Sequence, residues 1–171
     1  DVWSKLVASE FPAGNSVINA ELVRLATHLQ VDLVPLGLQY LLTETSMPER
    51  VLIALHLPKM PHAWTSNERM TYLQFMENAQ KIRGGSSYHL YVMQASHSFS
   101  ELLSDEESLR ILTIGEEYPN AALAALLRLP DVLDESAIDN LIRLDSAVDK
   151  GGLEDDVFKR LKTGITAILS Q

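Results

Sequence analysis

The chain has 171 residues, of which 46% are hydrophobic and 22% are charged, and it contains no cysteine. This composition is typical of a globular protein that is long enough to bury a sizeable core. A formal net charge of −9, with no run of Lys and Arg, disfavours a nucleic-acid binder and a membrane-surface helix, because both need a basic face. The lack of cysteine excludes disulfides, thiol nucleophiles and thiolate metal sites, and it fits a cytosolic chain as well as a secreted one.

No apolar run reaches the ~18 residues of a membrane span, so the sequence predicts no membrane insertion. No signal peptide is recognisable, and the chain begins with Asp1 in place of a methionine. We therefore expect a processed product or an excised domain.

Helical periodicity and helix-breaking residues divide the chain into helices. The expected helices cover about 1–9, 16–30, 32–42, 46–57, 65–83, 87–103, 104–116, 121–128, 134–150 and 153–169. The apolar stripes expected to face inward are Ile18, Leu22, Leu25 and Leu29 in the second helix, Leu38, Leu41 and Leu42 in the third, Ile138, Leu141 and Ile142 in the ninth, and Val157, Leu161, Ile165 and Ile168 in the last. No stretch alternates as a strand does.

Three Ser/Thr-x-x-Glu patterns predict capping boxes at helix starts: Ser46 with Glu49, Thr65 with Glu68, and Ser104 with Glu107. Asp32 and Asp134 are further candidate caps. After the helix that Thr65 opens, Arg83 is expected in the last turn and Gly84 at the left-handed position that ends it.

Helix-pair starts recur near Ser16, Pro48, Ser87 and Asn120, roughly 30–40 residues apart, which approaches the ~40–47-residue period of HEAT and armadillo repeats. The sequence therefore predicts an all-α fold over residues 1–171. We expect a single domain that forms a HEAT/armadillo-like right-handed α-solenoid of about four degenerate antiparallel helix pairs plus a final helix. A compact irregular helical bundle is the alternative.

Several motifs occur in a recognisable order. They are Phe11-Pro12-x-Gly14, Asn19-x-Glu21-Leu22-x-Arg24-Leu25, Trp64-Thr65 with Arg69, Tyr72 and Phe75, Arg83-Gly84-Gly85-x-Ser87, and Arg160-Leu161-Lys162-x-Gly164-Ile165. Together they resemble the HEAT-like helical region of large secreted bacterial proteins that combine a sugar-dehydrogenase-type (PQQ-type) propeller with a c-type haem domain. The resemblance implies a scaffold segment of an exported multidomain protein, periplasmic or secreted. The haem motif and the propeller are both absent from this sequence, so redox activity is not carried over to these residues.

Two candidate binding sites lie in the same stretch. Arg83, Gly84, Gly85, Ser86 and Ser87 could bind an anion through backbone N–H groups at a helix start and the Arg83 guanidinium. The alternative is a helix end followed by a helix start. Trp64, with Arg69 and Tyr72, is a candidate protein-contact set, whereas the alternative for Trp64 is packing over the first turn of its own helix.

The sequence presents no catalytic constellation. The five histidines (His28, His56, His62, His89 and His97) lack zinc-ligand spacing, and no Gly-x-Ser-x-Gly elbow occurs. Asp145-x-x-x-Asp149-x-Gly151 suggests calcium but lacks the ligand spacing of a calcium loop. We therefore expect no catalytic residue, metal or cofactor in this segment.

These observations predict a non-catalytic scaffold that contacts protein partners or neighbouring domains and binds no nucleic acid. The alternatives are a helical enzyme or ligand-binding domain with a pocket between its helices, and a self-contained helical adaptor. An apolar end left exposed at Trp3 or on the last helix would favour the scaffold.

Overall fold

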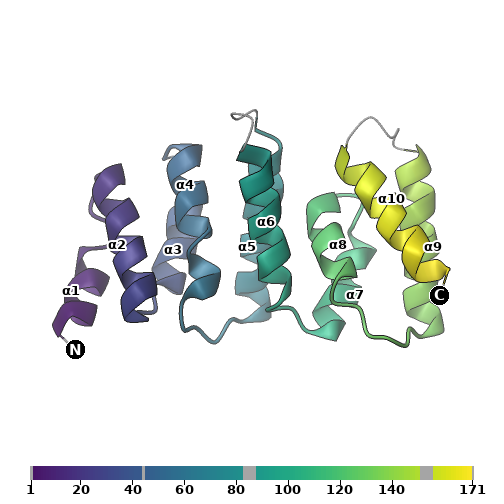
Figure 1. The fold of residues 1–171 in the computed structure, drawn as a ribbon, viewed down its shortest axis with the longest axis horizontal. Coiled ribbons are helices and arrows are strands. Elements are labelled where there is room, and N and C mark those ends of the chain that lie inside the picture. The colour runs from purple at the N-terminus through teal and green to yellow at the C-terminus, as the bar shows by residue number, and fades with distance from the viewer. Residues whose placement is uncertain (1, 44, 83–87, 151–155, 171) are drawn as a thin grey trace. The chain divides into compact units, whose positions relative to one another are not determined.

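The computed structural model describes residues 2–43, 45–82, 88–150 and 156–170, and these residues form ten α-helices, one 3-10 helix and no strand (Figure 1). The all-α prediction is confirmed. The helices are α1 (Val2–Glu10), α2 (Ser16–Leu29), α3 (Val34–Leu41), α4 (Met47–Ala54), the 3-10 helix η1 (Leu57–Lys59), α5 (Ser66–Gln80), α6 (Tyr88–Ser100), α7 (Asp105–Thr113), α8 (Pro119–Leu126), α9 (Glu135–Lys150) and α10 (Asp156–Leu169).

The chain divides into two compact units, Asp1–Ala95 and Ser96–Gln171, and the division falls inside α6. Each unit is described by itself below. The single domain expected from the sequence stays a prediction, because compactness does not measure whether two units unfold together.

In the first unit, consecutive helices pack as pairs and the pairs contact one another. Helix α1 packs on α2 and α3 packs on α4, while α2 also contacts α4 and α3 contacts α5. Large side chains that are fully buried fill the core of this unit: Leu33, Leu41, Ile53, Leu57, Tyr72, Leu73 and Met76. Consecutive helices are thus held by burial of apolar surface between pairs as well as within them.

Helix α2 turns a different face inward from the one expected. Its buried residues are Asn19, Val23 and Ala26, whereas Ile18 is 50% exposed and Leu25 is 46% exposed. The predicted inward stripe is therefore wrong at these two positions. The helix is apolar on two sides, and the packing of α4 selects the side with the smaller residues.

Glycine permits a close approach between α3 and η1. A Cβ atom at Gly37 would overlap the Leu57 side chain, which is itself fully buried. Any larger residue at position 37 would force the buried Leu57 side chain to shift.

In the second unit, helices pair in sequence and each pair contacts the next. Helix α7 packs on α8 and α9 packs on α10, while α7 also contacts α9 and α8 contacts α10. The core here contains Ile111, Leu112, Leu126, Ala137, Leu141, Leu144, Val148, Leu161 and Ile165. Ile138 and Ile142 of α9 are 38% and 50% exposed, so their expected inward orientation is wrong, and Leu144 and Val148 face inward in their place.

Two of the three predicted capping boxes are confirmed. Thr65 and Glu68 open α5 with reciprocal hydrogen bonds, and Ser104 and Glu107 open α7 in the same way. The box predicted at Ser46 is wrong, because Ser46 makes no side-chain cap bond.

Candidate functional site

The predicted anion site at Arg83, Gly84, Gly85, Ser86 and Ser87 lies outside the described residues. Helix α5 ends at Gln80 with Lys81 as its C-cap, so it is shorter than the helix expected over 65–83. The expected roles of Arg83 and Gly84 at the helix end also lie outside the described residues. Anion binding at this stretch stays a prediction.

Trp64 and Tyr72 lie in the core of the first unit. Trp64 is 8% exposed and Tyr72 is fully buried, and their rings meet edge to face with centroids 5.9 Å apart. The Tyr72 hydroxyl donates to the carbonyl of Ala54 at 3.0 Å, which ties α5 to the end of α4. These positions agree with the packing interpretation of Trp64. Arg69 is half-buried on the same helix, and its role at a partner surface stays a prediction.

A polar network that the sequence does not reveal joins four segments of the first unit. Asn19 on α2 accepts the Ala13 N–H at 2.7 Å, and its amide donates to the Tyr40 hydroxyl at 3.2 Å and to Glu49 Oε1 at 3.0 Å. The Tyr40 hydroxyl donates to the same carboxylate oxygen at 2.7 Å. Burial and the Glu49 carboxylate raise the pKa of Tyr40. The Glu49 carboxylate therefore accepts hydrogen bonds from Asn19 and Tyr40 instead of completing a capping box with Ser46.

His62 lies between two carboxylates that come from different parts of the first unit. Its Nδ1 is 2.7 Å from Asp32 Oδ2, and its Nε2 is 3.2 Å from Glu68 Oε1. Partial burial by itself lowers the pKa of the His62 imidazole, but the hydrogen bonds to Asp32 and Glu68 outweigh it and raise that pKa. Trp64 packs edge to face on this ring, with centroids 5.7 Å apart.

The acidic pair that suggests calcium holds a lysine. Lys162 Nζ of α10 lies 2.7 Å from Asp149 Oδ1 and 3.2 Å from Asp145 Oδ2. The hydrogen bond to Asp149 and the bond to Asp145 raise the pKa of the Lys162 ammonium. Asp145 and Asp149 therefore join α9 to α10 through Lys162.

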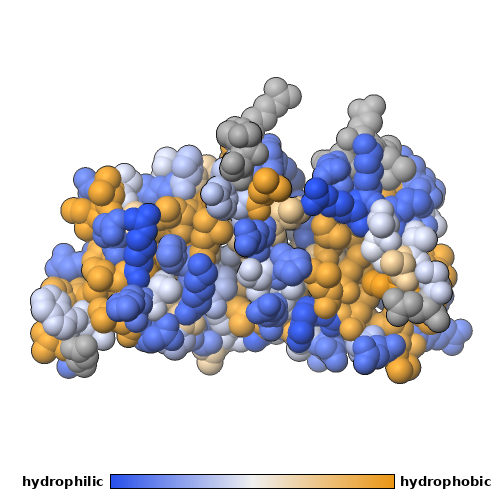
Figure 2. All heavy atoms as spheres, viewed as in Figure 1, coloured by the Kyte–Doolittle hydropathy of each residue, from blue (hydrophilic) through white to orange (hydrophobic). Residues whose placement is uncertain are grey.

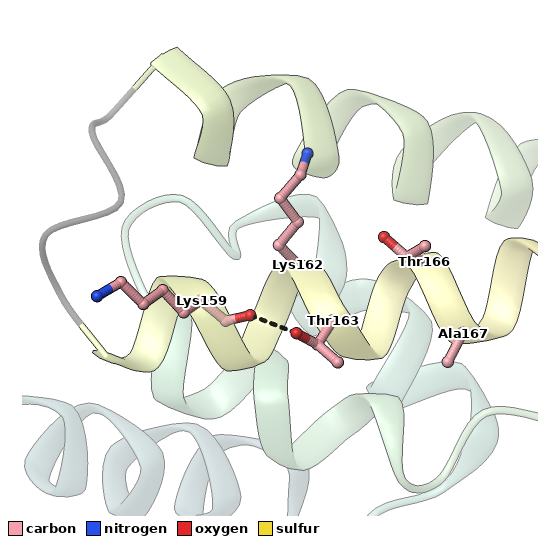
Figure 3. A pocket seen from close by; sticks show the side chains of 5 residues that line it. All are labelled: Lys159, Lys162, Thr163, Thr166 and Ala167. Carbon is pink, nitrogen blue, oxygen red and sulfur yellow. Dashed lines mark hydrogen bonds between the residues drawn. The ribbon is translucent and has the colours of Figure 1, made fainter.

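An open depression of about 510 Å³ runs along α10 (Figure 3). The described residues that line it are Lys159, Lys162, Thr163, Thr166 and Ala167. Figure 3 shows Lys159 and Lys162 pointing in different directions, and Thr163 donates to the Lys159 carbonyl at 2.9 Å. This arrangement offers neither converging charges nor an enclosed volume for a ligand.

Six large apolar side chains of α1 and α2 are exposed. We call the exposed residues Val2, Trp3, Leu6, Val17, Ile18 and Leu25 the α1–α2 face. Their exposed fractions run from 46% at Leu25 to 79% at Val2. Figure 2 shows hydrophobic atoms at this end of the first unit. Large exposed apolar patches mark binding surfaces more often than isolated apolar residues do.

Within the described ranges, no three His, Asp or Glu side chains converge to hold a metal ion. In the same part of the chain, no helix has the length and apolar character needed to cross a membrane. Comparison with protein-family models, with curated proteins and with solved structures gives no match to this chain.

Proposed function

We propose that the chain is a non-catalytic helical scaffold that docks a neighbouring domain or a partner protein through the α1–α2 face. In this proposal the helix pairs stack as a HEAT-like right-handed solenoid. Recognition depends on shape and buried apolar area, as in other repeat scaffolds. In this proposal, any catalytic activity or cofactor belongs to the domain or protein that the scaffold binds.

The contact pattern within each unit supports stacking of helix pairs. In the second unit, the first helices of successive pairs (α7 and α9) contact each other, and so do the second helices (α8 and α10). In the first unit, α2 contacts α4 and α3 contacts α5, and α4 also contacts α5. Contacts between corresponding helices of successive pairs support the solenoid proposal, because each repeat of a solenoid packs on its neighbours.

The observation that carries the proposal is the exposure of the α1–α2 face. Helix α2 has one apolar stripe that packs on α4 and a second that includes Ile18 and Leu25, both about half exposed. A helix that is apolar on two sides is typical of a layer covered on both sides. An aromatic residue, Trp3, lies on the neighbouring helix at 64% exposure, and tryptophan is among the commonest interface anchors.

The occupant that fits this face is an amphipathic helix or helix pair. The face consists of aliphatic side chains and one indole on two adjacent helices, which suits ridges-into-grooves packing of a further helix. With the resemblance to exported multidomain proteins, this favours a docked neighbour in a periplasmic or secreted assembly. The same resemblance is the basis for proposing that any redox activity belongs to the parent protein.

Site-specific photo-crosslinking tests the proposal in the natural host. A benzophenone amino acid is placed at Trp3 or at Leu25, and the crosslinked segment is identified by mass spectrometry. We expect both positions to crosslink to the same helical segment, because both lie on the α1–α2 face.

Val132 is the matched control position, since it is 85% exposed and lies in the second unit. Crosslinking at positions 3 and 25 that is no stronger than at position 132, or that reaches unrelated proteins from the two positions, would overturn the docking proposal.

A further inference from the structure

Both ring nitrogens of His62 face carboxylate oxygens, Asp32 Oδ2 at 2.7 Å and Glu68 Oε1 at 3.2 Å. An ionised carboxylate only accepts hydrogen bonds, and a neutral imidazole has a single N–H. Both bonds exist together only if His62 carries two ring protons and a positive charge. The geometry therefore describes an imidazolium between two carboxylates.

Each of these carboxylates also holds a helix start. The other oxygen of Asp32, Oδ1, accepts the N–H of Val34, the first residue of α3, at 3.0 Å. The other oxygen of Glu68, Oε2, accepts the N–H of Thr65, the N-cap of α5, at 2.8 Å. His62 thus connects the beginnings of two helices that are more than thirty residues apart in the sequence.

We infer that His62 is a proton-operated clamp within the first unit. With its proton bound, it ties the start of α3 to the start of α5. Loss of the proton leaves one N–H for two acceptors, so one of the two ties is released. The connection from η1 to α5, which carries His62 and the buried Trp64, then opens more readily.

The charged groups that bear on His62 come from two segments. They are Asp32 in the connection before α3 and Glu68 in α5; both attract the imidazolium, and no cation among the described residues opposes them. Hydrogen bonds from the Thr65 backbone and hydroxyl lower the pKa of Glu68, so that this carboxylate stays ionised over the range in which His62 titrates.

The sign of the pH dependence follows from the raised pKa of His62. The stabilisation is fully present below the imidazole pKa of the unfolded chain, ~6.5, and it is lost as the pH rises through the higher folded value. The clamp is therefore closed at acidic pH and opens as the solution becomes alkaline.

Nitrogen-15 NMR of the wild-type ring tests the clamp without any substitution. We expect both ring nitrogens to be protonated at about pH 6 and a single tautomer to remain at about pH 9. Exchange of the Thr65 and Glu68 amide hydrogens, corrected for hydroxide catalysis, should become about tenfold faster across this transition. A neutral ring at about pH 6, or exchange that does not follow the ring titration, would overturn the inference.

Three variants separate the clamp from general effects of pH. In His62→Gln, the fall in urea stability between about pH 6 and pH 9 should be smaller than in the wild type and in the control. His97→Gln is that control, because His97 is exposed, and it should follow the wild type. Glu68→Gln keeps a side chain able to cap α5 and should lower the titration midpoint of His62. A pH profile unchanged in His62→Gln contradicts the clamp.

Discussion

Tyr72 makes the hydrogen bond whose removal is simplest to interpret. Its ring is fully buried, and its hydroxyl donates to the Ala54 carbonyl at 3.0 Å. We expect Tyr72→Phe to lower the free energy of unfolding by about 1–2 kcal/mol, because the ring stays and only the bond is lost. Urea unfolding measures this. Tyr91→Phe is the control, since Tyr91 is 58% exposed, and a loss as large as that of Tyr72→Phe would contradict the assignment.

Glu49 offers a second test at the same scale. Its Oε1 accepts hydrogen bonds from both Asn19 and Tyr40. Glu49→Ala leaves two donors without an acceptor and should cost ~2–3 kcal/mol, whereas Glu49→Gln retains an accepting oxygen and should cost less than half as much. Equal losses in the two variants, measured by urea unfolding, would mean that the network does not depend on this oxygen.

The hydrogen bonds of a side chain could be predicted where its partner lies only a few residues away in the sequence. Thr65 and Glu68 are three residues apart, and their reciprocal bonds follow from local geometry. Asn19 and Glu49 are 30 residues apart, and Glu49 fits a capping pattern equally well by its spacing. The packing of α2 against α4 decides whether Glu49 caps its own helix or bonds to Asn19, and the spacing of residues in the sequence does not reveal that packing.

At the scale of a helix, the caps provide a matched pair of substitutions. Ser104 accepts the Glu107 N–H at 3.2 Å and opens α7, whereas the Ser46 side chain makes no such bond at α4. Ser104→Ala should lower the free energy of unfolding by ~1 kcal/mol, and Ser46→Ala by less than ~0.5 kcal/mol. Urea titration of each variant measures both values, and a reversed order would refute the cap assignment.

Helix positions were predictable to within a few residues, but the faces that they bury were predicted less well. Breakers such as Pro12 and Pro130 act locally, so the helix ends follow from the sequence. Helices α2 and α9 each have apolar residues on more than one side, and periodicity alone does not rank those sides. Neighbouring helices make the choice, as with Leu144 of α9, which lies against the Gly115 backbone.

At the scale of the whole molecule, the charges are distributed unevenly. The first unit has seven basic and eight acidic residues, and the second has seven basic and fifteen acidic residues, so their formal charges are −1 and −8. Like charges on one unit repel one another and weaken its compact state, and dissolved salt screens that repulsion. The stability of the second unit should therefore depend on salt much more than that of the first.

The two tryptophans make this difference measurable. Trp3 and Trp64 both lie in the first unit, so tryptophan fluorescence follows that unit alone, whereas far-UV circular dichroism follows the helices of both. Raising NaCl from about 10 mM to about 0.5 M should raise the thermal midpoint seen by circular dichroism more than that seen by fluorescence. The difference should be about 4–8 °C if screening contributes ~1 kcal/mol.

Charge-reversal variants provide the control for this experiment. Glu116→Lys replaces one negative charge of the second unit by a positive charge at an exposed position and should reduce the salt-dependent difference, whereas Glu10→Lys in the first unit should not. Equal shifts of the two signals at every salt concentration would show that the units unfold as one cooperative domain. That outcome would contradict the separate salt response argued from the charges and would support the single domain that the sequence predicts.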